Sequence, residues 1–174
     1  MLKSFGSALA ACVLAVLVNA CTTLVAPYDP TFDTALNTLS ENTATFLAGA
    51  EAREAEQSYR SRAAVAYYAS TYNVLDRLSE RARLTRAAVP CPTNKTLASF
   101  VSEVPEKVAL PSDYTAFDCR EFQLYSVRFY VGQLDYAHQS GGTLNGSEAR
   151  AVGGALQIAI LGAIQTFVTN KPSK

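Results

Sequence analysis

The sequence predicts an all-α protein, a helical bundle of about four main helices with one disulfide. Apolar side chains recur three and four residues apart along several long segments, which is the spacing of one face of a helix. No segment alternates convincingly between apolar and polar residues, as a half-buried strand would. Proline and glycine clusters separate the segments, and amphipathic helices joined in this way bury their apolar faces against one another.

The first predicted helix follows Asp29, which can act as the N-cap, with Pro30 at the first helical position. Apolar or small side chains lie at helical spacing along one of its faces: Phe32, Leu36, Leu39, Thr43, Phe46 and Ala50. We expect this face to be buried.

The second predicted helix runs from about Glu51 to Ala88 and stops before Pro90. Its apolar stripe consists of Val65, Tyr68, Tyr72, Leu75, Leu78 and Ala82. Tyr67 and Tyr68 are neighbours on this helix and point in different directions, so at least one of them should lie outside the core or at its rim.

The third long helix is predicted from Asp113 to about His138, with Ser112 as its cap. The segment before it, from Thr93 to Val104, is expected to form a short helix at best. Two apolar stripes lie about 200° apart on the long helix. One comprises Phe122, Tyr125, Phe129, Gly132 and Tyr136, and the other Leu124, Val127, Val131 and Leu134. A helix with two apolar faces is usually sandwiched between neighbours.

The last predicted helix runs from Gly146 to about Thr169, and Asn145 with Glu148 forms a start similar to a capping box. It is apolar nearly all round, which is typical of a helix that is buried or lies in a membrane. The apolar stretch from Val152 to Val168 is short for a membrane span and contains Gln157. We therefore expect a buried helix.

The N-terminus has the features of an export signal: Lys3, then an apolar run, with no acidic residue before Asp29. The run closes with Val18-Asn19-Ala20-Cys21, which resembles the lipobox of bacterial lipoproteins. The resemblance implies cleavage between Ala20 and Cys21 and acylation of Cys21. Several acyl chains anchor a protein to a membrane far more firmly than a single chain.

This resemblance divides the chain into a signal peptide (1–20), a lipidated tether (21–28) and a helical domain (29–174). Thr22 follows the cysteine in place of the aspartate that favours retention at the inner membrane, which implies the outer membrane, facing the periplasm. Two different readings of the N-terminus stay open. Cys12 ends a second lipobox-like run, and the segment could also be an ordinary signal peptide or an uncleaved anchor.

Cys91 and Cys119 form an even pair once Cys12 is removed and Cys21 is acylated. In an oxidising compartment such a pair is expected to form a disulfide, and the alternative is two free thiols. The bridge would tie the exit of the second helix to the first turns of the third.

Composition excludes some classes of function. Without Lys3, the basic residues number one fewer than the 15 acidic residues, so no basic field is present to attract nucleic acid. The single histidine, His138, is expected to stabilise a helix C-terminus. The carboxylate pairs Asp76/Glu80 and Asp118/Glu121 are expected to be solvated ion-pair faces. We predict no enzyme activity, no metal site and no cofactor.

The resulting hypothesis is a non-enzymatic binding or structural protein of the cell envelope, held on the membrane through Cys21 and contacting another envelope protein. Tyrosine and arginine are common interface anchors, so the possible interaction face consists of Tyr67, Tyr72, Arg77 and Arg81. The spacing of Pro27-Tyr28-Asp29, Leu36, Leu39, Thr43 and Phe46 resembles that of small uncharacterised helical lipoproteins of proteobacteria. The pilotins that assist secretin assembly resemble this chain in size, anchor and disulfide.

Two further functions are compatible with the same anchor and helical body. The first is that of an envelope immunity or inhibitor protein. The second is that of a small-molecule or lipid binder, with a pocket between helices lined by Phe122, Tyr125 and Phe129.

Overall fold

A computed structural model describes residues 28–52, 58–95, 97, 110–144 and 146–168. Its long helices are α2 (Pro30–Glu51), α3 (Arg62–Leu84), α5 (Cys119–Gly141) and α6 (Gly146–Val168). The described residues contain no strand, only an isolated bridge between Ser58 and Thr143. The predicted all-α fold is confirmed.

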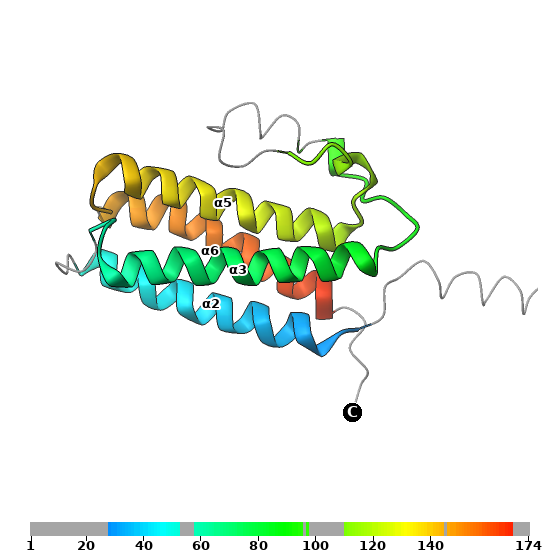
Figure 1. Cartoon of the computed structure of the whole chain (residues 1–174), viewed down its shortest axis with the longest axis horizontal. Coiled ribbons are helices and arrows are strands. Elements are labelled where there is room, and N and C mark those ends of the chain that lie inside the picture. Colours follow the sequence, from blue (N-terminus) through cyan, green and yellow to red (C-terminus); the bar gives the residue numbers. More distant parts are fainter. Residues whose placement is uncertain (1–27, 53–57, 96, 98–109, 145, 169–174) are drawn as a thin grey trace, which may run out of the picture.

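The helices run alternately up and down, and each packs against two others (Figure 1). The packed pairs are α2–α3, α3–α5, α5–α6 and α6–α2, so the four helices enclose one core. The short connection 142–145 favours antiparallel packing of α5 and α6, whereas the longer segment 85–118 joins α3 to α5.

Helix α2 forms as its sequence predicts. The Asp29 carboxylate accepts a hydrogen bond from the Thr31 amide at 3.0 Å, and Pro30 occupies the first helical position. All members of the predicted face are buried: Phe32, Leu36, Leu39, Thr43, Phe46 and Ala50.

Helix α3 begins later than predicted. Glu51 ends α2, and the Ser61 hydroxyl caps α3 by accepting a hydrogen bond from the Ala64 amide at 3.0 Å. The prediction of a helix from Glu51 to Ala88 is therefore wrong at its start, and it places the end of the helix one turn too late. The buried stripe of α3 begins at Ala64 and not at Val65, because Val65 is 57% exposed.

Helix α5 begins at Cys119, so the prediction of a start at Asp113 with a Ser112 cap is wrong. A short 3₁₀ turn occupies Tyr114–Ala116 instead. Asp118 caps α5 in a capping box, in which the Glu121 side chain accepts from the Asp118 amide at 3.1 Å. Cys119 is bonded to Cys91, which confirms the disulfide.

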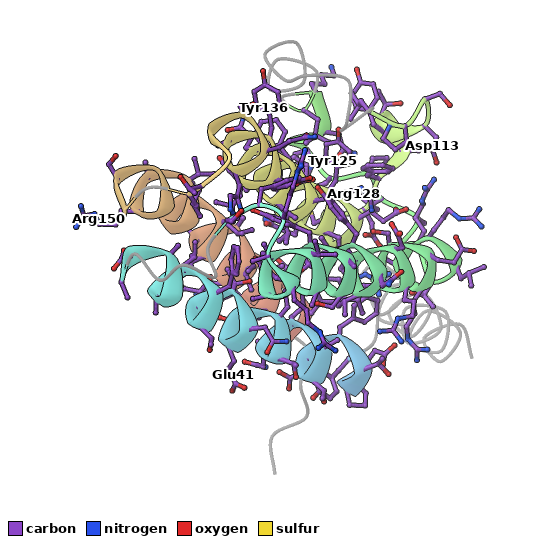
Figure 2. All side chains as sticks on the ribbon, turned by 60° about the vertical axis from the view of Figure 1, so that its left-hand side comes forward. Glu41, Asp113, Tyr125, Arg128, Tyr136 and Arg150 are labelled. Atoms are coloured by element: carbon purple, nitrogen blue, oxygen red, sulfur yellow. A yellow bond between two sulfur atoms is a disulfide. The ribbon has the colours of Figure 1, made fainter. Side chains whose placement is uncertain are left out.

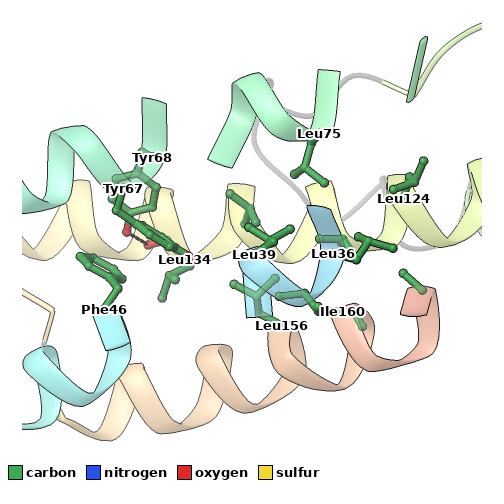
Figure 3. Close-up of a cluster of buried hydrophobic side chains, with 14 of the residues drawn as sticks. Leu36, Leu39, Phe46, Tyr67, Tyr68, Leu75, Leu124, Leu134, Leu156 and Ile160 are labelled. Atoms are coloured by element: carbon green, nitrogen blue, oxygen red, sulfur yellow. Dashed lines mark hydrogen bonds between the residues drawn. The ribbon is translucent and has the colours of Figure 1, made fainter. Parts of the chain in front are cut away.

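The core contains aliphatic side chains from all four helices, packed at the centre of the bundle (Figure 3). Among them, Leu36, Leu75, Leu124 and Leu156 are completely buried. Stacked aromatic rings extend the core toward both ends: Phe32 packs on Phe167, and Phe46 packs on Tyr67, each with ring centroids 4.1 Å apart.

Helix α6 is buried along one face only. Its stretch Arg150–Val168 has a mean hydropathy of 1.7 and could cross a membrane by length and composition alone, and 33% of it is buried in the bundle. The buried face includes Leu156 and Ile160. On the outer face Ile158 is 73% and Leu161 53% exposed, so the expectation of a helix buried all round is wrong for this side.

Candidate functional site

The candidate site arises from the two apolar stripes of α5. The stripe of Leu124, Val127, Val131 and Leu134 is part of the main core. On the opposite face, Tyr125 and Phe129 form a second buried cluster with Leu97 and Phe117. The prediction that α5 is sandwiched is confirmed, except that Tyr136 projects into solvent (Figure 2).

A cleft of about 440 Å³ lies beside this second cluster, between α5 and α6. Its walls are Leu97, Phe122, Gln123, Tyr125, Ser126, Phe129, Tyr130, Ala155, Ile158, Ala159 and Gly162. Phe122, Tyr125 and Phe129 are the three residues that the sequence predicts as a pocket lining. The structure brings them together.

Leu97 reaches the cleft because the chain before it is fixed to the start of α5. The disulfide joins Cys91 to Cys119, and the Cys91 amide donates to the Phe117 carbonyl at 2.7 Å. The Asn94 side chain donates to the same carbonyl at 2.7 Å. Sequence reasoning found the disulfide but not this wall of the cleft.

Among the described residues, the walls of the cleft include no charged side chain, and their polar groups are few. The Ser126 hydroxyl donates to the Phe122 carbonyl at 2.9 Å and is thereby satisfied. Gln123 lies across from Gly162, whose missing side chain leaves the amide room: a Cβ at Gly162 would come 3.3 Å from the Gln123 Oε1 atom. Within the described residues, the Gln123 amide has no hydrogen-bond partner.

A group of ion pairs secures the junction between α3 and α5. Asp118 accepts hydrogen bonds from the Ala87 amide at 2.9 Å and from the Arg120 guanidinium at 2.8 Å. Glu121 pairs with Arg86 at 2.7 Å, and Arg86 also pairs with Asp113. Because Asp118 and Glu121 are buried, the prediction of a solvated pair is wrong here.

The pKa of Asp118 reflects this setting. Burial opposes ionisation of the carboxyl, but hydrogen bonds from the Ala87 amide and the Arg120 guanidinium outweigh it, and the pKa lies below its usual value. Asp76 and Glu80 differ from Asp118. They are exposed and pair with Arg128 and Arg83, as predicted for ion pairs in solvent.

His138 lies in the last turn of α5, as predicted, and it is completely buried. Its Nδ1 atom lies 3.1 Å from the Tyr68 hydroxyl. Nearby, the Tyr72 hydroxyl donates to Asp135 at 3.1 Å. Burial raises the pKa of both Tyr68 and Tyr72 above the usual tyrosine value. Helical spacing alone could not reveal this polar cluster, because its members come from two helices.

The structure divides the predicted interaction face. Tyr67 is buried, stacks on Phe46 and hydrogen-bonds Thr43 at 3.0 Å, so it does not belong to an accessible face. The expectation that Tyr67 or Tyr68 lies outside the core is therefore wrong. A stacked partner and a hydroxyl partner make burial favourable for Tyr67.

The rest of the predicted face lies on α3. Tyr72 is half-buried, with the Arg128 guanidinium 5.5 Å from its ring centre, and Arg128 is labelled on α5 in Figure 2. Arg77 and Arg81 line a groove between α2 and α3 of about 690 Å³. Arg81 is paired with Asp29.

Some of the residues predicted to be functional or to cap a helix lie outside the part of the chain that the structure describes. Ala20 and Cys21 lie outside the described residues, as does Asn145. Among the described residues, no cluster of three histidine, cysteine or acidic side chains could hold a metal ion.

No protein-family model, curated protein or solved structure matches the chain.

Proposed function

We propose that this protein is a lipoprotein anchored through Cys21, facing the periplasm from the outer membrane, and that its helical domain acts by binding rather than by catalysis. The anchor rests on the sequence Val18-Asn19-Ala20-Cys21, which resembles a lipobox. The uncharged cleft between α5 and α6 is the observation that carries the binding role.

The cleft has the dimensions and chemistry of a binding site for a small apolar molecule. Its volume of about 440 Å³ lies within the usual range for ligand sites, about 300 to 1,000 Å³. Aromatic and aliphatic side chains supply most of its surface, with a few polar groups among them. This combination favours binding of a small molecule over a purely structural role.

The anchor is tested by measuring the intact mass of the protein purified from the membranes of a bacterial host, with and without reduction. The expected mass corresponds to cleavage before Cys21 plus acyl chains, and reduction of the disulfide adds two hydrogen atoms. A Cys21→Ala variant should lose the acyl mass, whereas a Cys12→Ala variant should keep it. A processed chain without acyl groups would contradict the anchor.

A second candidate function, binding of an envelope protein in the manner of a pilotin, is favoured by the groove between α2 and α3. Arg77 is exposed at this groove beside Leu78 and Val74, so it offers a positive charge next to apolar surface. If a protein docks here, Arg77→Glu should abolish one specific crosslink in intact cells. Arg60→Glu, at an exposed arginine outside the groove, should preserve it.

A further inference from the structure

We propose that the cleft between α5 and α6 binds a single neutral, largely hydrocarbon molecule with one hydroxyl group, of the class of long-chain alcohols. This inference deepens the binding role proposed above and rests on it. It comes from the volume of the cleft, the uncharged side chains of the described residues that line it, and the position of the Gln123 amide.

The volume sets the size of the ligand. An apolar cavity of about 150 Å³ accommodates benzene. In proportion, the cleft of about 440 Å³ has room for roughly 18 non-hydrogen atoms. A single hydrocarbon chain fits this space. A helix, which is about 10 Å across including its side chains, does not.

The uncharged walls set the electrical character of the ligand. An ionised group taken out of water needs a partner of opposite charge, and none of the described residues that line the cleft carries a charge. Arg128, also on α5, is already paired with Asp76. A neutral ligand is therefore favoured over a fatty acid anion of the same length.

Gln123 sets the polar end of the ligand. An amide offers one acceptor and two donors, so it can accept a hydrogen bond from a hydroxyl and donate one back. The Tyr130 side chain is half-buried in the same wall. The Gln123 Oε1 atom lies against Gly162, 3.3 Å from the position that a Cβ there would take, so the amide is held at the wall of the cleft.

The test uses the mature chain, residues 21–174, with Cys21→Ser so that its own acyl chains cannot compete. All four helices, the disulfide and the core lie within this chain. Binding is followed with N-phenyl-1-naphthylamine, a neutral aromatic probe that fluoresces in apolar surroundings. We expect saturable binding of one probe per chain, and displacement by 1-tetradecanol at least tenfold more effective than by ionised tetradecanoate.

Two glycines of α6 provide matched variants. Gly162→Leu places a side chain in the cleft and should weaken probe binding at least tenfold. Gly154→Leu makes the same change of helix propensity, but its side chain would enter open space outside the cleft, and binding should be unchanged. Gln123→Leu should keep the probe but abolish the preference for tetradecanol over tetradecane.

The outcomes separate this inference from the proposed function. Equal displacement by the alcohol and the anion, or equal effects of the two leucine variants, would overturn it while leaving some binding role and the anchor intact. Absence of saturable binding would overturn both this inference and the cleft as a small-molecule site. A dimer that light scattering detects for the wild type but not for Gly162→Leu would identify a second copy of the chain as the occupant instead. The mass measurement tests the anchor independently.

Discussion

Asp118 holds three parts of the chain together. It caps α5, accepts a hydrogen bond from the Ala87 amide beyond the end of α3, and pairs with the buried Arg120. Arg120 also donates to the Thr85 carbonyl. Removing a partner from a buried ion pair leaves an uncompensated charge, which is far more damaging than losing an exposed pair.

We expect Asp118→Asn to lower the free energy of unfolding at neutral pH by about 3 kcal/mol, because Arg120 loses its anionic partner. An exposed pair contributes at most about 1 kcal/mol, so Asp76→Asn is the control. Chemical denaturation of both variants measures the difference. Similar losses for the two variants would contradict the role assigned to Asp118.

The pH dependence follows from the lowered pKa of Asp118. The folded state favours the carboxylate, so this stabilisation is complete above the usual value of 3.8 and is lost as the pH falls through the lower folded pKa. The melting temperature of the wild type should therefore fall more steeply than that of Asp118→Asn as the pH decreases below about 4.

At the scale of the elements, two adjacent glycines in α6 have opposite surroundings. A Cβ at Gly153 would lie 2.6 Å from the Leu47 Cδ1 atom, so α2 and α6 approach closely there. A Cβ at Gly154 would meet nothing within 4 Å. Both glycines reduce helix propensity equally, but only Gly153 permits close packing.

Gly154→Ala should therefore raise the free energy of unfolding by up to about 1 kcal/mol through helix propensity. Gly153→Ala should lower it by about 1 kcal/mol or more, because Leu47 has to move within a packed core. Thermal unfolding of the two variants in parallel measures the difference. A stabilised Gly153→Ala would show that Leu47 rearranges at little cost.

Local signals in the sequence were sufficient for some elements. Asp29-Pro30 located the start of α2, and the two stripes of α5 identified the aromatic lining of the cleft. The start of α3 and the Asp118 cap were missed, because the residues before them also fit a helix and the choice depends on contacts such as Tyr59 with the Gly142 carbonyl at 2.9 Å. Leu97 and Gly162 of the cleft depend in the same way on contacts between distant segments.

At the scale of the whole molecule, the disulfide closes a loop between residues 28 apart in sequence. Such a constraint restricts the unfolded chain, and it also fixes the segment that carries Leu97 into the cleft. The bridge therefore supports both the stability of the bundle and the shape of the candidate site.

The double variant Cys91→Ser/Cys119→Ser should lower the free energy of unfolding by about 3–4 kcal/mol, as chain entropy predicts for this loop. For a chain of this size the melting temperature should fall by roughly 10 °C. Circular dichroism should still show the helices, while probe binding in the cleft weakens because Leu97 is released. Unchanged stability would contradict the structural role of the bridge.

The stacking of Phe32 on Phe167 places the beginning of α2 beside the end of α6. Six residues, 22–27, lie between the proposed lipidation site, Cys21, and Tyr28, so these two residues are at most about 25 Å apart. The 22 residues of α2 are about 33 Å long, and the turn at Gly142 lies at the far end of the bundle (Figure 1). If Cys21 is acylated as proposed, the Phe32–Phe167 end would stay close to the bilayer surface. The Gly142 turn would then extend away from the membrane, where proteins that are not themselves membrane-bound would meet it.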